Sequence, residues 1–198
     1  EIILQQTRVS QGLDYYIKFN ATFPTIKDLS LAHEQQVLKL WQGLGYYSRA
    51  RNLHATAKHI HFNLKGLFPN NYKDLLKLKG VGPYTASAIS SICFNERRAA
   101  VDGNVYRVLA RVFSINTAIN STQGIKEFQQ LADSLISKKE PGDYNQGLME
   151  LGATVCTPKK VDCTNCPINS LCKAKSQNTI YQFPIKEKKI KIKERHLN

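Results

Sequence analysis

Residues 78–86 read LKGVGPYTA, in which two glycines flank one aliphatic residue. The preceding run 72–78 (YKDLLKL) has helical spacing, and Pro83 suits the first position of a following helix. Two glycines at such a turn allow a tight hairpin whose backbone amides point outward at a helix N-terminus, where an anion can bind. The sequence therefore predicts a helix-hairpin-helix at about residues 72–95.

A DNA phosphate suits the amides of Gly80, Val81 and Gly82 without any base being read. The alternative is a plain helix–helix turn, because a Gly-x-Gly pair alone is a weak signal. The preceding Leu-Lys and the following Pro-x-Thr-Ala favour the DNA-binding interpretation.

Helical periodicity continues along the chain. Apolar residues recur every three or four positions over 34–42, 47–62, 104–114, 124–137 and 143–154. No stretch alternates convincingly with period two, so we expect an all-α fold. No apolar run approaches the roughly 18 residues of a membrane helix, and the first residues lack a signal-peptide pattern.

The chain is strongly basic, with 28 Lys plus Arg against 15 Asp plus Glu in 198 residues. Residues 186–195 carry a net charge of +4, so +9 of the total +13 belongs to the body of the protein. A basic body indicates a polyanionic partner, most simply nucleic acid. Charge that serves only solubility is the alternative.

Four of the five cysteines lie within 156–172, separated by six, two and five residues. Such a cluster fits a metal site in a reducing cytosol rather than disulfides between distant loops. Zinc is one candidate, although zinc sites more often pair two short knuckles. Cys93 lies alone in an apolar run, where we expect a buried small side chain.

Asp102, in the run 100–107 (AVDGNVYR), comes directly before a helical segment. Its carboxylate can cap that helix by accepting amide hydrogen bonds, which the spacing alone favours. It can also stabilise a positive charge that develops beside it in a reaction. The two roles are compatible.

Together these motifs resemble the helix-hairpin-helix DNA glycosylases, specifically the MutY-type adenine DNA glycosylases. The matching pieces run in order from the first residue to Cys172. They are Glu1–Thr7 (EIILQQT), Trp41–Leu53 (WQGLGYYSRARNL), Gly80-Val81-Gly82, Val101–Val105 (VDGNV) and the four cysteines.

The resemblance implies a two-lobed all-α fold with DNA in the cleft between the lobes. We expect residues 1–115 to form a helical barrel lobe that carries the hairpin. Residues 116–175 would form the C-terminal helices and a [4Fe-4S] cluster lobe, completed by missing N-terminal sequence. Residues 176–198 read as a basic linker towards an absent C-terminal domain, and the chain, which opens on Glu1, reads as a fragment.

The resemblance also assigns catalytic roles. Glu1 would be the general acid that protonates the adenine leaving group, and Asp102 would stabilise the oxocarbenium-like sugar. Tyr84 and Asn104 would support them. The implied reaction is hydrolysis of the glycosidic bond of an adenine extruded from a duplex, opposite 8-oxoguanine or guanine.

DNA-contacting residues follow from the same motifs. Gln6, Leu44 and Tyr46 resemble residues that wedge into the duplex, and Thr7 and Arg49 are further candidates beside them. The alternative for Leu44 and Tyr46 is core packing, and Trp41 is expected in the core.

Two other functions remain open. Endonuclease III-type glycosylase/lyases share the hairpin and the cysteines, but they carry a lysine where this chain has Tyr84 and usually Asp-Thr-His where it has Asp102-Gly103-Asn104. A phenol cannot form the imine of the lyase reaction, so we expect a monofunctional enzyme. A non-catalytic iron–sulfur DNA-binding protein would have no need for Glu1, Tyr84 and Asp102 together.

The resemblance and the spacing favour a [4Fe-4S] cluster on Cys156, Cys163, Cys166 and Cys172 over zinc. The expected partner is double-stranded DNA containing A:8-oxoguanine or A:G mispairs. We expect a monomeric, cytoplasmic, nucleoid-associated bacterial protein with no membrane partner.

Overall fold

A computed structural model of the chain describes residues 1–188. These residues form helices and no β-strand, which confirms the predicted all-α fold. They divide into two compact units, of which the first is Glu1–Arg98 and the second begins at Ala99. Over residues 1–188, none of the helices has the length and apolar character needed to cross a bilayer.

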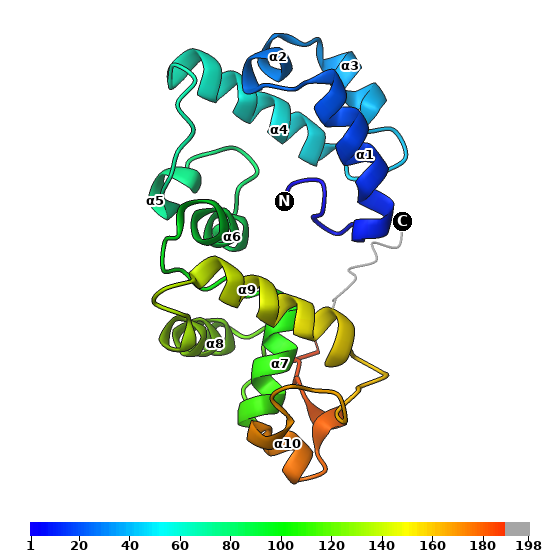
Figure 1. The fold of residues 1–198 in the computed structure, drawn as a ribbon, viewed down its shortest axis with the longest axis vertical. Helices are drawn as coiled ribbons and strands as arrows, with labels where there is room; N and C mark the ends of the chain where they lie inside the picture. Colours follow the sequence, from blue (N-terminus) through cyan, green and yellow to red (C-terminus); the bar gives the residue numbers. More distant parts are fainter. Residues whose placement is uncertain (189–198) are drawn as a thin grey trace, which may run out of the picture. The chain divides into compact units, whose positions relative to one another are not determined.

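The first unit is a set of helices (Figure 1) that enclose a larger apolar core around Trp41 and a smaller one around Leu75. Its elements are α1 (Val9–Thr22), α2 (Ile26–Leu31), α3 (Glu34–Leu40), α4 (Ser48–Lys58), the π-helical turn η1 (His59–Asn63), α5 (Tyr72–Leu75) and α6 (Pro83–Phe94). Both α2 and α3 pack against α4. Trp41 is fully buried, as predicted, and its ring meets Phe19 edge-on with the centroids 6.1 Å apart.

The predicted helix-hairpin-helix is present, with a shorter first helix than the sequence indicated. α5 ends at Leu75, and the chain continues in tight turns in which the Leu78 amide donates to the Leu75 carbonyl at 3.0 Å. Leu75 and Leu78 are buried with Ile60 and Ala86 in a small core beneath the hairpin. This core fixes the hairpin on the rest of the unit.

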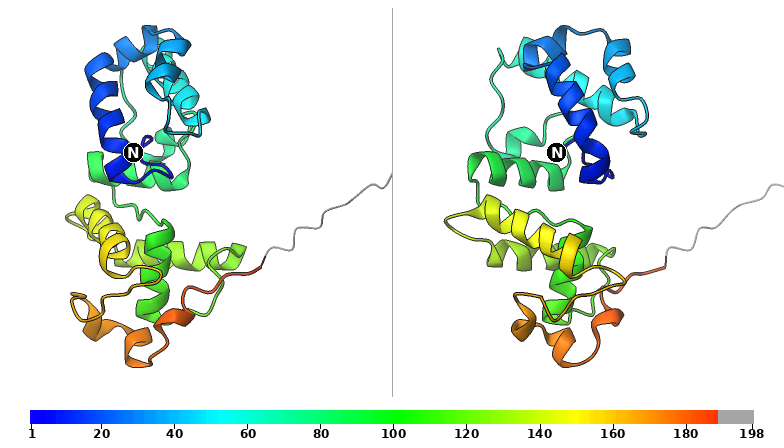
Figure 2. Two further views of the ribbon diagram at one scale, coloured as in Figure 1. Left: turned by 90° about the vertical axis from the view of Figure 1, so that its right-hand side faces the viewer. Right: turned by 45° about the vertical axis from the view of Figure 1, so that its right-hand side comes forward.

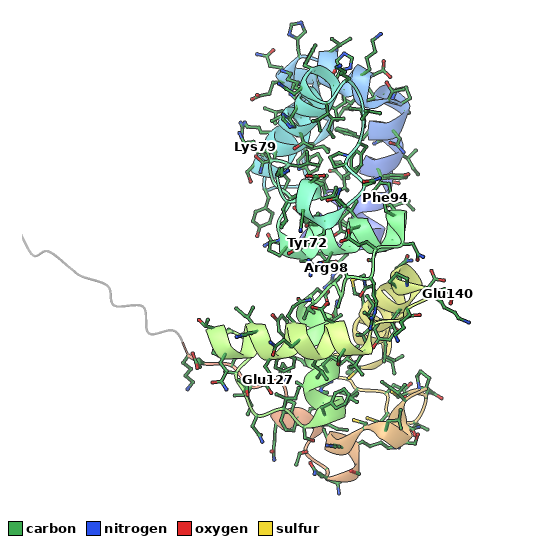
Figure 3. All side chains as sticks on the ribbon, turned by 90° about the vertical axis from the view of Figure 1, so that its left-hand side faces the viewer. Tyr72, Lys79, Phe94, Arg98, Glu127 and Glu140 are labelled. Carbon is green, nitrogen blue, oxygen red and sulfur yellow. The ribbon has the colours of Figure 1, made fainter. Side chains whose placement is uncertain are left out.

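The last residues of the first unit fasten α5 to the end of α6. Glu96 Oε2 accepts a hydrogen bond from the Tyr72 amide at 2.6 Å. The Arg98 guanidinium lies 3.9 Å from the centre of the Tyr72 ring (Figure 3). Cys93 is exposed, contrary to the prediction, because it lies in the last turn of α6, where Ile92 and Phe94 are exposed as well.

The second unit is organised around α7. Its elements are α7 (Gly103–Phe113), α8 (Thr122–Leu135), α9 (Pro141–Glu150), the π-helical turn η2 (Leu151–Val155), α10 (Lys173–Ser176) and the 3₁₀ turns η3 (Asn169–Leu171) and η4 (Ile180–Gln182). α7 contacts α8, α9, α10 and η2 (Figures 1 and 2). Its apolar face joins Val105 and Leu109 to Phe128 of α8 in the core.

The division between the units differs from the sequence-based boundary after residue 115. α7 carries Asp102 at its start and packs on α10 and η2, so it belongs to the second unit, with the cysteines. The basic-linker prediction for 176–198 falls partly on residues 189–198, which lie outside the described residues.

Candidate functional site

Asp102 caps the N-terminus of α7, as the spacing predicted. Its Oδ1 accepts hydrogen bonds from the amides of Asn104, at 2.9 Å, and Val105, at 2.8 Å. Its Oδ2 accepts from Asn104 Nδ2 at 2.9 Å. The partly exposed carboxylate is therefore fixed at the positive end of the helix, an arrangement that can stabilise a cation beside it.

The segment before Asp102 is held by side chains from α8 and α9. The buried Asn145 accepts a hydrogen bond from the Ala100 amide at 3.0 Å through its Oδ1. Asp133 Oδ1 accepts from the Ala99 amide at 3.1 Å. Both sides of Asp102 are thus anchored, so its position depends on three helices of the unit.

Arg107, one turn further along α7, extends this network and was not predicted. Its Nη2 donates to Asn104 Oδ1 and to the Gly152 carbonyl, at 2.8 and 2.7 Å, and its Nε donates to the Cys156 carbonyl at 2.7 Å. Its side chain is buried, and this burial together with the Arg111 charge lowers the pKa of its guanidinium, while Cys156 and Asp102 raise it. Arg107 connects Asp102, through Asn104, to the first cysteine.

Arg111 continues the same face of α7 and was also missed. It is 2% exposed, and its Nη1 donates to the Cys156 Sγ at 3.2 Å and to the Thr157 carbonyl at 2.9 Å. Its Nε donates to the carbonyls of Ile180 and Phe183. A single buried cation therefore holds both the start of the cysteine loop and the chain that follows it.

The four cysteines line one cavity together with apolar side chains such as Val108, Val112 and Ile168. All four are unpaired and half-buried. Burial, reinforced by the three neighbouring cysteines, raises the pKa of the Cys163 thiol. Over the described residues 1–188, no three His, Cys, Asp or Glu side chains are grouped so that they could hold a single metal ion. The thiols surround a space instead, and they are chemically suited to bind a soft metal group there.

In the first unit, the hairpin forms a tight glycine turn directly before α6. Gly80 has φ +82°, which favours glycine, and Gly82 precedes α6 without a side-chain cap, while the Val81 amide donates to the Leu78 carbonyl at 3.2 Å within the turn. Thr56 Oγ1 donates to the Lys79 carbonyl at 2.9 Å. A methyl group on Gly80 would come within 2.7 Å of Asn52 Cβ, so α4 packs closely against the turn.

Tyr84 lies in the first turn of α6, two residues after the second hairpin glycine, and is half-buried. The next residue, Thr85, is buried, and its Oγ1 accepts a hydrogen bond from Gln5 Nε2 at 2.9 Å. The N-terminal segment that carries Glu1 therefore lies beside the start of α6 (Figure 2). Glu1 and Tyr84 belong to the same unit, whereas Asp102 and Asn104 belong to the other.

The predicted DNA-contacting residues divide into exposed and buried groups. Gln6, with φ +55°, is exposed, and Tyr46 is 63% exposed. Leu44 is 6% exposed and lies in the apolar core, which agrees with the alternative prediction of core packing for this residue. Arg49 is 7% exposed, and its guanidinium bonds to backbone carbonyls, so the structure does not present it as a surface contact.

Comparison with known proteins fits this arrangement. Residues 1–134 match the description HhH-GPD superfamily base excision DNA repair protein. The chain belongs to the HhH-GPD superfamily. It is 46% identical over 175 residues to the adenine DNA glycosylase of Mus musculus, covering 88% of this chain and 34% of that protein. It is 41% identical over 189 residues to the adenine DNA glycosylase of Buchnera aphidicola subsp. Baizongia pistaciae, covering 96% and 53%.

This HhH-GPD chain therefore spans about a third to about half of the length of these curated relatives. Among solved structures, a thermostable thymine-DNA glycosylase superposes with a TM-score of 0.80 at 29% identity, over 89% of this chain and 81% of that one. A non-covalent endonuclease III–DNA complex superposes with a TM-score of 0.76 at 21% identity, over 89% and 81%. The second likeness concerns the fold alone.

Proposed function

We propose that the chain carries a monofunctional adenine DNA glycosylase activity that removes adenine opposite 8-oxoguanine or guanine. The observation that carries the proposal is the fixed carboxylate of Asp102, held by two α7 amides and Asn104. The adenine DNA glycosylases named above are 41% and 46% identical to the chain, which supports the choice of base. The partner would be double-stranded DNA.

In the proposed reaction the target adenine leaves the base stack, because its glycosidic bond is inaccessible inside a duplex. Glu1 would protonate the departing base, and the Asp102 carboxylate would stabilise the positive charge that develops on the sugar. Asn104 would hold the Asp102 carboxylate in place through Nδ2. The hairpin turn, with the N-terminus of α6 that follows it, would bind a phosphate of the same duplex.

Tyr84 separates this proposal from the lyase alternative. It stands where endonuclease III-type enzymes carry lysine, and its phenol cannot form an imine with the sugar. The abasic strand would therefore remain intact after base removal. A purely DNA-binding function would leave the close support of Asp102 by Asn104 and Arg107 without a chemical purpose.

The four cysteines would hold a [4Fe-4S] cluster. The residues fit this group, because four unpaired thiols line one cavity and Arg111 donates to the Cys156 sulfur at 3.2 Å. When bound, such a cluster supplies metal–thiolate bonds whose free energy stabilises the surrounding loop. Arg107 and Arg111, which both donate to the Cys156 carbonyl, would link the stabilised loop to α7.

The test is a single-turnover glycosylase assay on a duplex with adenine opposite 8-oxoguanine, with A:G and thymine glycol duplexes as comparisons. Glu1→Gln should abolish adenine release and leave duplex binding nearly intact. Asp102→Asn, which keeps an oxygen for capping α7, should slow release by at least about 100-fold. Glu34→Gln, which removes an exposed surface carboxylate, is the matched control. Wild-type-like rates in either site variant would refute the assigned roles.

A further inference from the structure

Arg49 forms hydrogen bonds with two separate segments of the first unit. Its Nη1 donates to the carbonyls of Ile3, at 2.9 Å, and Gln5, and to Thr7 Oγ1 at 3.2 Å. Its Nη2 donates at 3.4 Å to the carbonyls of both Leu44 and Gly45. One guanidinium therefore joins the segment that carries Glu1 to the loop that carries Tyr46.

Aromatic side chains surround Arg49 and also hold the loop to which it bonds. Its guanidinium carbon lies 5.3 Å from the centre of the Trp41 ring and 5.7 Å from that of Tyr46. Trp41 Nε1 donates to the Gly45 carbonyl at 3.1 Å. Tyr15 Oη, from α1, donates to the Gln42 carbonyl at 3.0 Å. The loop before α4 is thus held by three side chains from different positions in the sequence.

The chemistry of these contacts favours a positioning role over a DNA contact. The side chain is 7% exposed, and in the described residues its bonds go to neutral oxygens rather than to a carboxylate. The planar guanidinium offers several donors in a fixed geometry, which an ammonium or an apolar side chain cannot reproduce. Its two terminal nitrogens are engaged with these oxygens, and its buried Nε, which has no hydrogen-bond partner in the described residues, is shielded from the surface, so the group is not available to a phosphate.

We propose that Arg49 is a positioning residue that sets the location of Glu1 relative to the Tyr46 loop. The proposal rests on the proposed function, in which Glu1 is the general acid, and on the sequence-based expectation that Tyr46 enters the duplex. The segment 1–7 contains no regular helix and has only two backbone turn hydrogen bonds of its own, from Leu4 to Glu1 and from Thr7 to Leu4, so tertiary hydrogen bonds such as those of Arg49 help to set its conformation. Without Arg49 the segment would retain the bond from Gln5 to Thr85 and the packing of Ile2 and Ile3 on the core, but it would lose its hydrogen bonds to α4.

The experiment compares Arg49→Met and Arg49→Lys with Arg51→Met. Arg51 is the matched control, because it lies two residues further along α4 but is exposed and pairs with Glu34 at the surface. Single-turnover adenine release and duplex affinity are measured separately, and hydrogen–deuterium exchange is followed over the whole chain. Arg49→Met should slow release by about 100-fold with little change in duplex affinity, as expected when a reacting group is misplaced by about 1 Å.

Exchange in Arg49→Met should rise in residues 1–8 and 42–47 and stay at the wild-type level in α3 and α6. Arg49→Lys, which keeps the charge and some donors, should recover part of the rate. A wild-type rate in Arg49→Met, or faster exchange throughout the first unit, would overturn the proposal in favour of no role or a general folding role. An inactive wild type would instead overturn the proposed function, while exchange in residues 1–8 would still decide whether Arg49 holds that segment.

Discussion

Asp102 and Arg107 are joined through one side chain: Asn104 Nδ2 donates to Asp102 Oδ2 at 2.9 Å, and Asn104 Oδ1 accepts from Arg107 Nη2 at 2.8 Å. Because the same guanidinium donates to the Cys156 carbonyl, the carboxylate and the cysteine loop share a continuous set of hydrogen bonds within one unit. A substitution that displaces the cysteine loop should therefore also shift the Asp102 carboxylate, and the reverse should hold.

The first prediction concerns Arg107. Arg107→Met should destabilise the second unit by about 3 kcal/mol or more, because it leaves the Gly152 carbonyl and the Asn104 amide oxygen without their charged donor and leaves the Cys156 carbonyl with Arg111 alone. Urea unfolding measures the loss, with the exposed Lys126→Met as control. Equal stability of the two variants would contradict the structural role given to Arg107.

The second prediction concerns the hairpin. Gly80→Ala and Gly66→Ala both place a side chain at positive φ, +82° and +80°, at a cost of about 1 kcal/mol each. Only at Gly80 would the new methyl group also meet Asn52, so Gly80→Ala should be the less stable variant and the only one with weaker duplex binding. Fluorescence anisotropy with a labelled duplex gives the affinities, and matched losses in both variants would show that Asn52 has no part in the effect.

The third prediction concerns Tyr84. Incubation of a substrate duplex with the wild-type protein should leave an abasic strand that breaks only after alkali or heat, because a phenol cannot form a Schiff base. Tyr84→Lys restores the amine found in the lyase family and should become trappable on DNA by borohydride. Efficient trapping of the wild type together with burst-phase strand nicking would rule out the monofunctional mechanism.

The fourth prediction concerns the cysteines. The isolated protein should contain iron and sulfide and absorb broadly near about 400 nm. The Cys166→Ser variant should contain no iron, and its second unit should be less stable. The Cys93→Ser variant, which changes an exposed cysteine of the first unit, should keep the iron content and the stability of the wild type. Metal analysis that finds about one zinc ion and no iron would overturn the cofactor assignment without touching the DNA-binding one.

The fifth prediction is a dependence of stability on pH. Burial, with a smaller contribution from Lys58, lowers the pKa of His54 below its ordinary value of 6.5. The unfolded chain then binds a proton that the folded chain does not, so stability should fall as the pH drops below about 6.5. His54→Gln should reduce this slope in urea titrations between pH 7 and 5, and the exposed His59→Gln should not.

Much of this arrangement could be predicted from local sequence. The Gly-Val-Gly turn before Pro83 predicted the hairpin, and the position of Asp102 before a periodic run predicted its capping role. Both predictions were correct because the signal lies in residues adjacent in the chain, where turn and capping geometry is determined. The fully buried Trp41 followed from its place on an apolar helix face.

The residues that the sequence did not identify act over long distances along the chain. Besides the local bond of Arg107 to Asn104, Arg107 and Arg111 each bond to carbonyls 45 positions further along the chain, and charged side chains ordinarily lie at the surface. The available signal was their spacing of four residues, which places two cations on one face of an otherwise apolar helix. Arg49 was expected to contact DNA because it lies in a motif shared with the resembling family. In the structure it is buried against carbonyls of residues 1–7, and this segment has no hydrophobic periodicity from which the contact could be predicted.

The π-helical turn η2 also makes the length of the chain before Cys156 significant. In this turn the Cys156 amide donates to the Leu151 carbonyl, five residues earlier, at 2.7 Å, so the turn accommodates one residue more than an α-helical turn. Deleting a single residue here would restore ordinary α-helical register and rotate the following chain by about 100°. The Cys156 carbonyl, which follows the turn, would then no longer face Arg107. Between α9 and the cysteine loop, evolution can therefore exchange side chains more freely than it can change the residue count.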